Sequence, residues 1–253
     1  MSKACIFCGD RANSKEDVPP RWALRLLRKS AGEKVPIRTY RYGHSPRQWM
    51  TGDTATRIGT VCKGCNNGWM CRLEEEIKPI FLPMIFGVPA RLTTAQQERI
   101  TTWLTKCAMM LGSMGKGDVF YDGFDFLHFK KTIYPLCDTS VWLGHYKGMG
   151  RSISDYRTLR TKLRSGGSIK THVVTMSMGQ LVLQFASVKR VEYQELLPQI
   201  DIPTFGPSLT SATVQIWPMK LRDVSWPPAL SFDDSDRHLK LLVYRFGGDM
   251  RND

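Results

Sequence analysis

Two Cys-x-x-Cys pairs constrain this chain more than any other feature of its sequence. Cys5 and Cys8 form the first pair, and Cys62 and Cys65 form the second. Four thiolates at this spacing are typical of a closed tetrahedral zinc site, in which the metal stabilises the fold and performs no chemistry. The alternative is two unrelated pairs of buried thiols. We therefore expect a structural Zn²⁺ ion held by these four cysteines.

A short polar motif follows each cysteine pair. The first is Glu16-Asp17-Val18-Pro19-Pro20, and the second is Asn66-Asn67-Gly68-Trp69 directly after Cys65. Together with the cysteines, these motifs resemble the HNH endonuclease family in its zinc-knuckle form, which has Cys-x-x-Cys-Gly, Glu/Asp-His-x-x-Pro and Cys-x-x-Cys-Asn. The resemblance is specific over roughly the first 80 residues. It implies a treble-clef (ββα-metal) module and metal-dependent hydrolysis of phosphodiesters.

One position departs from the family pattern, because Asp17 stands where the family has its general-base histidine. In the family, that histidine takes a proton from the water that attacks the phosphodiester, and one divalent ion stabilises the developing charge. A carboxylate is a far weaker base than imidazole, although it is a good ligand for Mg²⁺. Three interpretations stay open: a degenerate nuclease, a shifted active site, or a deliberately inactivated one.

The resemblance assigns further roles beside Asp17. Glu16 would be a second acidic ligand or an orienting group for a catalytic Mg²⁺ or Mn²⁺ ion. Asn66 matches the family asparagine that braces the loop carrying the base, and it would equally suit the cap of the following helix. These assignments make Asp17, Glu16 and Asn66 candidate catalytic residues.

Two further positions complete the candidate site. The family places a metal ligand on the helix after the second knuckle, where Glu74 and Glu75 are the natural candidates. The alternative is that these glutamates form a solvated acidic start to that helix. His44 is the histidine nearest to the predicted module, and a base that had moved from position 17 would be expected there.

The charge balance of the chain is strongly basic. Its 36 Lys and Arg residues outnumber its 23 Asp and Glu residues, which gives a formal net charge of +13. A field of this sign attracts polyanions and makes their binding dependent on salt. We expect a nucleic-acid partner, DNA rather than RNA, with a protein as the second possibility.

The candidate nucleic-acid-binding residues lie in two segments. One is the basic face of a helix that begins after Pro20, and the other is a stretch around residues 38–47 in which basic and aromatic residues alternate. The alternatives are a solvated helix face and an ordinary exposed hairpin. The candidates are Arg21, Arg25, Arg28, Lys29, Arg38, Arg41 and Arg47.

Length and composition limit the class of protein. With 253 residues, 42% of them hydrophobic, the chain can form a small metal module and a larger core. It has no apolar run of about 18 residues and no signal segment at its start, so we expect a cytoplasmic protein with no membrane span. Seven cysteines, four of them at metal spacing, argue against a disulfide framework.

Hydrophobic periodicity predicts helices over residues 21–29 and 69–85, and a third that opens at Thr93 or Thr94. Pro79 and Pro83 are expected to end or kink the second helix. After residue 117 the chain is expected to form strands, joined by a basic connection over residues 151–167. The expected strands are 141–146, 169–176, 181–188, 212–217 and 239–246.

These patterns predict an α+β protein in two parts. Residues 1–88 would form the four-cysteine zinc treble-clef module, packed on a larger α+β domain with a mainly antiparallel sheet at residues 89–253. The predicted function is that of an HNH-like zinc protein acting on nucleic acid, either an endonuclease or a degenerate or inactivated version of one. The alternative is a non-catalytic, zinc-stabilised regulator of the phage or defence-system type that binds DNA, RNA or protein.

Overall fold

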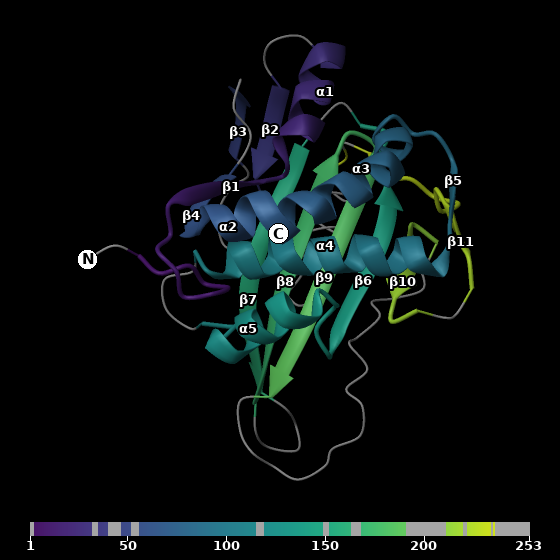
Figure 1. Ribbon diagram of the computed structural model, residues 1–253. Helices are drawn as coiled ribbons and strands as arrows, with labels where there is room; N and C mark the ends of the chain where they lie inside the picture. Colours follow the sequence, from purple (N-terminus) through teal and green to yellow (C-terminus); the bar gives the residue numbers. More distant parts are fainter. Residues whose placement is uncertain are drawn as a thin grey trace.

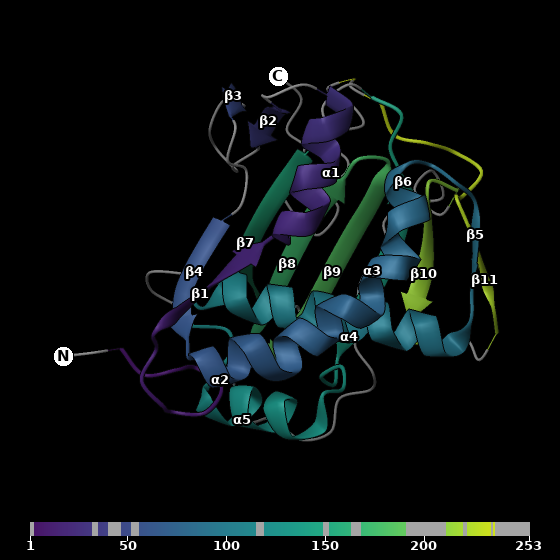
Figure 2. The same ribbon diagram turned by 45° about the horizontal axis from the view of Figure 1, so that its top comes forward.

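The computed structural model describes residues 3–31, 35–39, 47–51, 56–114, 119–148, 152–162, 168–190, 211–219, 222–233 and 235. Figure 1 shows helices packed on one face of a large sheet, and Figure 2 shows the same layers from a second direction. The helical segments are α1 (Arg21–Ala31), α2 (Lys63–Cys65), the π-helical turn η1 (Asn66–Met70), α3 (Cys71–Ile85), α4 (Thr94–Gly112) and α5 (Gly123–Thr132).

The main sheet has seven strands in the order β10-β6-β9-β8-β7-β2-β3. All neighbouring strands pair antiparallel except β2 and β7, which pair parallel. The predicted α+β class with a mainly antiparallel sheet is therefore confirmed. Its strands are β2 (Val35–Thr39), β3 (Arg47–Thr51), β6 (Thr139–His145), β7 (Ser152–Lys162), β8 (Ser168–Met178), β9 (Leu181–Arg190) and β10 (Thr213–Trp217).

Two smaller antiparallel pairs flank this sheet. One pair joins β5 (Ala90–Leu92) to β11 (Val224–Trp226). The other joins β1 (Ser14–Val18) to β4 (Thr56–Val61), and the chain then passes directly from β4 into α2, η1 and α3. The first cysteine pair precedes β1 and the second follows β4, so this β-pair and the helices after it carry the candidate site.

Helix α4 packs against the sheet and against α3, and residues 100–111 are buried on every side of it. Its start matches the prediction, because Thr93 and Gln96 form a capping box. The buried threonines of α4 satisfy their hydroxyl groups by donating to carbonyl oxygens one turn earlier, as Thr101 does to Gln97 at 2.8 Å. Lys106 cannot bond in this way and needs an anionic partner inside the core.

Helix α5 joins the N-terminal loop to the main core through aromatic contacts. Phe7, between the first two cysteines, packs edge-on against Trp69 at 5.1 Å and against Phe126 of α5 at 5.5 Å between ring centroids. Trp69 also packs edge-on against Phe129 of α5, at 5.8 Å. One hydrophobic cluster consequently runs from the cysteine loop through α3 and α4 to the sheet.

Two sequence predictions were wrong. Residues 151–167, expected to be a basic connection, include the strand β7, which pairs with β8 along its length. Exposure alternates over residues 156–160 of β7, with residues 156, 158 and 160 exposed and residues 157 and 159 half-buried, as suits a strand with one covered face. The segment after Gly117 was expected to hold only strands, yet it contains α5, which begins with a capping box formed by Asp122 and Asp125.

Other sequence predictions agree with the structure. The hairpin predicted around residues 177–180 is formed by β8 and β9. Helix α3 covers most of the predicted span, but it continues past Pro79 and Pro83 to Ile85, so neither proline ends it, and a kink at either stays a prediction. The strand predicted at 239–246 lies outside the described residues, and the domain boundary after residue 88 stays a prediction.

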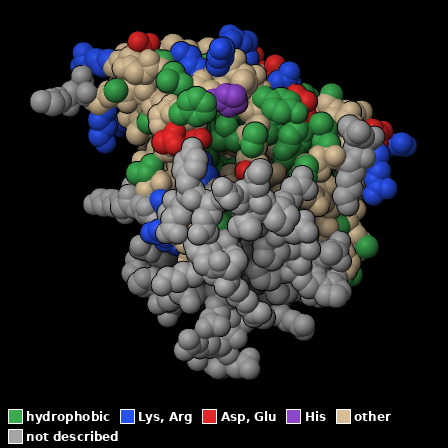
Figure 3. Space-filling model, turned by 90° about the horizontal axis from the view of Figure 1, so that it is seen from below, with side chains coloured by type: hydrophobic (Ala, Val, Ile, Leu, Met, Phe, Trp, Pro, Cys, Tyr) green, Lys and Arg blue, Asp and Glu red, His purple; other side chains and the backbone are tan. Residues whose placement is uncertain are grey.

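The outer surface carries one apolar area near α5. Figure 3, seen from below, shows hydrophobic side chains gathered on the side where α5 lies in Figure 1. Val119, Phe124 and Leu127 are 61%, 76% and 59% exposed. Within the described part of the chain, no helix has the length and apolar character to cross a membrane.

Candidate metal centre and its neighbouring charges

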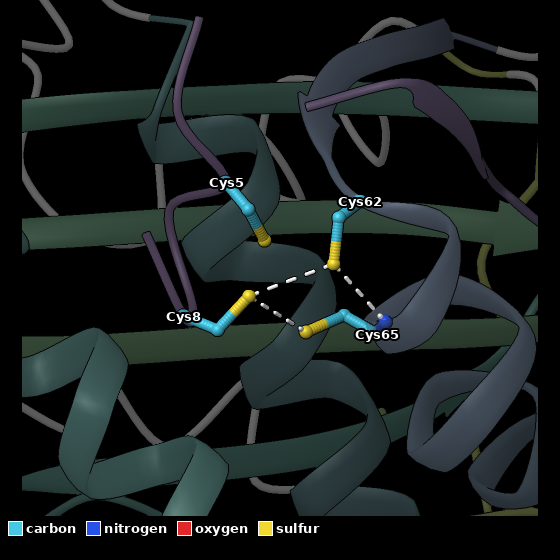
Figure 4. A group of neighbouring side chains, drawn as sticks. All are labelled: Cys5, Cys8, Cys62 and Cys65. Carbon is cyan, nitrogen blue, oxygen red and sulfur yellow. Dashed lines mark hydrogen bonds between the residues drawn. The ribbon is translucent and has the colours of Figure 1, made fainter. Parts of the chain in front are cut away.

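The four predicted cysteine ligands come together in the structure. The Sγ atoms of Cys5, Cys8, Cys62 and Cys65 all lie within 4.8 Å of one another. Figure 4 shows the four side chains converging from two segments of the chain, with Cys8 Sγ 3.5 Å from Cys62 Sγ and 3.6 Å from Cys65 Sγ. A tetrahedral site with Zn–S bonds of about 2.3 Å would place its sulfurs about 3.8 Å apart. The cluster therefore has the geometry to hold a metal ion such as zinc.

Local backbone bonds shape both cysteine loops. In the first loop, the Gly9 amide donates to the Cys5 carbonyl at 2.9 Å, and Gly9 has a φ of +79°, which favours glycine. In the second loop, the Cys65 amide donates to Cys62 Sγ at 3.3 Å. Burial tends to raise the pKa of Cys62, but this amide and the neighbouring thiols lower it overall, whereas burial raises the pKa of Cys8 and of Cys65.

Cys71 does not belong to the metal cluster. Its side chain is exposed, and its Sγ lies 3.8 Å from Glu75 Oε1. The metal cluster therefore consists of the four cysteines at knuckle spacing, in agreement with the sequence prediction.

Asn66 connects the second cysteine loop to β1. Its Nδ2 atom donates to Ser14 Oγ at 2.7 Å and to the Lys15 carbonyl at 3.1 Å. The structure gives Asn66 this bracing contact, whereas the helical segments that follow it, η1 and α3, have their N-cap positions at Cys65 and Met70, without a side-chain cap. The brace holds β1 directly before Glu16 and Asp17.

Asp17 forms an ion-paired cluster with two arginines. Its Oδ2 atom lies 2.7 Å from Arg21 Nε, and its Oδ1 atom lies 3.5 Å from Arg57 Nε. Arg57 is the residue directly opposite Asp17 in the antiparallel pair of β1 and β4, so the two side chains leave the same face. Arg21 reaches the carboxylate from the first position of α1. We call this group the Asp17 arginine cluster.

Glu16 points to the other face of β1, because successive side chains of a strand alternate. Its carboxylate is hydrogen-bonded to Lys106 Nζ, which also lies 3.1 Å from Glu74 Oε1. The Lys106 side chain is completely buried, and those of Glu16 and Glu74 are 8% and 22% exposed. We call this group the Lys106 triad.

Opposing effects set the charges of the Lys106 triad. Burial by itself would lower the pKa of Lys106, but the negative charge of Glu16, with a contribution from Glu74, raises it above its ordinary value. Burial raises the pKa of Glu74, although the charge of Lys106 opposes this. Lys106 is therefore held as a cation. Neither interpretation of Glu74 in the sequence anticipated this contact with a buried lysine.

The remaining candidate residues differ in how much of each the structure describes. Arg21 and Arg25 are exposed on α1. Arg28 and Lys29 lie on α1, Arg38 on β2 and Arg47 on β3, all at positions where only the backbone is described. His44 and Arg41 lie outside the described residues, and their proposed roles stay predictions.

Two important residues escaped the sequence analysis. Lys106 is a single charged residue three positions after Trp103 and four before Met110, both of which belong to the apolar stripe of α4. That spacing could have revealed a buried lysine. Arg57 gave no comparable signal, because its contact with Asp17 depends on the register between β1 and β4.

Comparison of the chain with protein-family models, curated proteins and solved structures gave no match. The functional argument therefore rests on the site itself.

Proposed function

We propose that this protein is a zinc-stabilised, nucleic-acid-binding protein of HNH-like build, in which the position of the general base has become part of an ion-paired cluster. The observation that carries the proposal is the pairing of Asp17 with both Arg21 and Arg57. If Asp17 accepted a proton, it would lose the negative charge that both arginines contact. A metal ion at the same carboxylate would have to compete with two guanidinium groups.

Three other features support this proposal. An antiparallel β-pair followed by helices, with a cysteine pair before the first strand and another after the second, agrees with the module that the HNH resemblance implies. The Glu16 carboxylate is buried against Lys106 and does not share the partners of Asp17. The net charge of +13 favours binding to a polyanion.

The binding part of the proposal can be tested with fluorescently labelled single-stranded DNA, double-stranded DNA and RNA. Affinity should fall steeply as salt rises from about 50 to 200 mM, because each phosphate that the protein neutralises contributes about −0.9 to the slope of log K against log salt for duplex DNA. Affinity that does not change with salt, or no binding to any of the three, would contradict the proposal.

A second candidate function, metal-dependent cleavage, is favoured by one specific observation. Asn66 bonds to the start of β1 as the HNH resemblance implies for the asparagine that braces the base. The two candidates differ in their outcome: the leading proposal expects the protein with Asp17 to leave plasmid and single-stranded substrates intact in Mg²⁺ or Mn²⁺, and Asp17→His to increase cleavage. Cleavage by the unaltered protein would show instead that it is an enzyme.

A further inference from the structure

We propose that Arg21 and Arg57 form a clamp for one phosphodiester group of a nucleic-acid backbone, and that Asp17 positions the two guanidinium groups. This inference rests on the proposed function and assigns it a specific site. It joins Arg21, a sequence candidate, to Arg57, which the sequence did not suggest. It also gives position 17 a role in binding.

The clamp is supported first by how the three side chains converge. Each carboxylate oxygen of Asp17 faces the Nε atom of a different arginine. Arg57 is fixed by strand pairing, and Arg21 is fixed at the start of α1, immediately after Pro19 and Pro20. Two separate elements therefore contribute one arginine each, and the two guanidinium groups meet at one carboxylate.

Exposure provides the second argument. The Asp17 side chain is only 15% exposed, whereas those of Arg21 and Arg57 are 51% and 46% exposed. The anion thus lies beneath two cations that reach the surface. A guanidinium group has five N–H donors in a planar fork that matches the oxygens of a phosphate.

The third argument is the number of arginines at one carboxylate. Asp17 is paired with two arginines at once. By contrast, Arg91 with Asp223 and Arg99 with Glu76 form pairs of one cation and one anion, also through Nε, at 3.0 and 3.3 Å. These two neutral pairs are a matched control, because their removal takes the same number of arginine charges from a different part of the molecule.

The experiment compares Arg21→Gln/Arg57→Gln with Arg91→Gln/Arg99→Gln in the full chain. The probe is a labelled DNA duplex, and its affinity is measured over a series of salt concentrations. A clamp on one phosphate predicts that the first double variant loses about 0.9 in the slope of log K against log salt, while two independent phosphate contacts would cost about 1.8. The control variant should lose less than the clamp variant.

The outcomes separate this inference from the proposed function. If the unaltered protein binds with a steep salt dependence but the two double variants lose slope equally, the clamp is wrong and the proposed function stands. A loss of about 1.8 also overturns the single clamp. Failure of the unaltered protein to bind any nucleic acid overturns both proposals together.

A second variant guards against the possibility that glutamine at both positions impairs folding. Arg21→Lys/Arg57→Lys keeps both charges but removes the planar forks. The clamp predicts that this variant keeps most of the salt dependence yet binds the duplex more weakly than the unaltered protein. Unchanged affinity would contradict the clamp, because charge alone would then account for binding.

Discussion

The two faces of β1 hold neighbouring carboxylates in opposite surroundings. On the inner face, Glu16 shares the buried cation of Lys106 with Glu74. On the outer face, Asp17 pairs with the partly exposed cations of Arg21 and Arg57. The inner group is one positive and two negative charges, and the outer group is one negative and two positive charges.

This difference separates a structural role from a binding role. Buried charges cost much free energy when one partner is removed, so the Lys106 triad makes the positions of β1, α3 and α4 depend on one another. Exposed ion pairs stabilise a fold by only about 0–1 kcal/mol each, so the Asp17 arginine cluster can be altered without loss of the fold. Four predictions test this contrast, in order of expected effect.

The largest effect is expected from removal of the four-cysteine site. Without it, β1 would no longer be held in place, and the difference between its two faces would be lost. Cys62→Ser or a strong chelator should unfold the N-terminal segment, since structural zinc contributes about 10–16 kcal/mol of apparent binding free energy in zinc-finger peptides. Circular dichroism, thermal unfolding and metal analysis measure this. Cys71→Ser, at an exposed cysteine outside the cluster, is the control and should keep its metal. An unchanged melting profile in Cys62→Ser would rule out a structural metal.

The second prediction concerns the inner face. Lys106→Met should lower the free energy of unfolding by about 3–5 kcal/mol, because it leaves Glu16 and Glu74 buried without their cation. Urea denaturation measures the change. Lys131→Met, on the exposed side of α5, should change stability by no more than about 0.5 kcal/mol. Equal losses in the two variants would show that the triad has no special structural role.

The third prediction concerns the pH dependence of the same triad. Burial raises the pKa of Glu74 above its ordinary value of 4.5, so its charged form is less favourable in the folded than in the unfolded protein. As pH rises from 4.5 toward the higher folded pKa, ionisation of Glu74 therefore reduces stability. Glu74→Gln keeps an oxygen acceptor for Lys106 and removes this penalty.

Urea denaturation below pH 4.5 and at neutral pH tests this sign. Relative to the unaltered protein, Glu74→Gln should become more stable as pH rises. Any loss of metal at acid pH affects both proteins and cancels in the difference. The opposite trend would mean that the ion pair with Lys106 outweighs the cost of burying Glu74.

The smallest effect is expected on the outer face. Asp17→Asn should change the free energy of unfolding by no more than about 1 kcal/mol, since both of its arginine partners are about half exposed. Glu76→Gln, which alters another exposed ion pair, is the matched control. A loss in Asp17→Asn as large as that in Lys106→Met would show that the two faces do not differ as proposed.

Several features could be predicted because short-range chemistry determines them. The two cysteine loops follow from ligand spacing and tight turns, and the start of α4 follows from the capping box of Thr93 and Gln96. The bracing role of Asn66 came from the resemblance to HNH proteins, and the structure gives that side chain contacts with β1. The capping box of Asp122 and Asp125 that begins α5 is equally readable in the sequence.

The sequence by itself determined the four cysteines that could hold a metal ion and the elements that local patterns define. Only the tertiary structure decided that Glu16 turns inward to Lys106 and that Asp17 turns outward to Arg21 and Arg57. Those contacts require a particular register between β1 and β4 and a particular rotation of α4 against them. Adjacent carboxylates are alike in a sequence, and the packing of distant segments gives each its own partners, burial and charge.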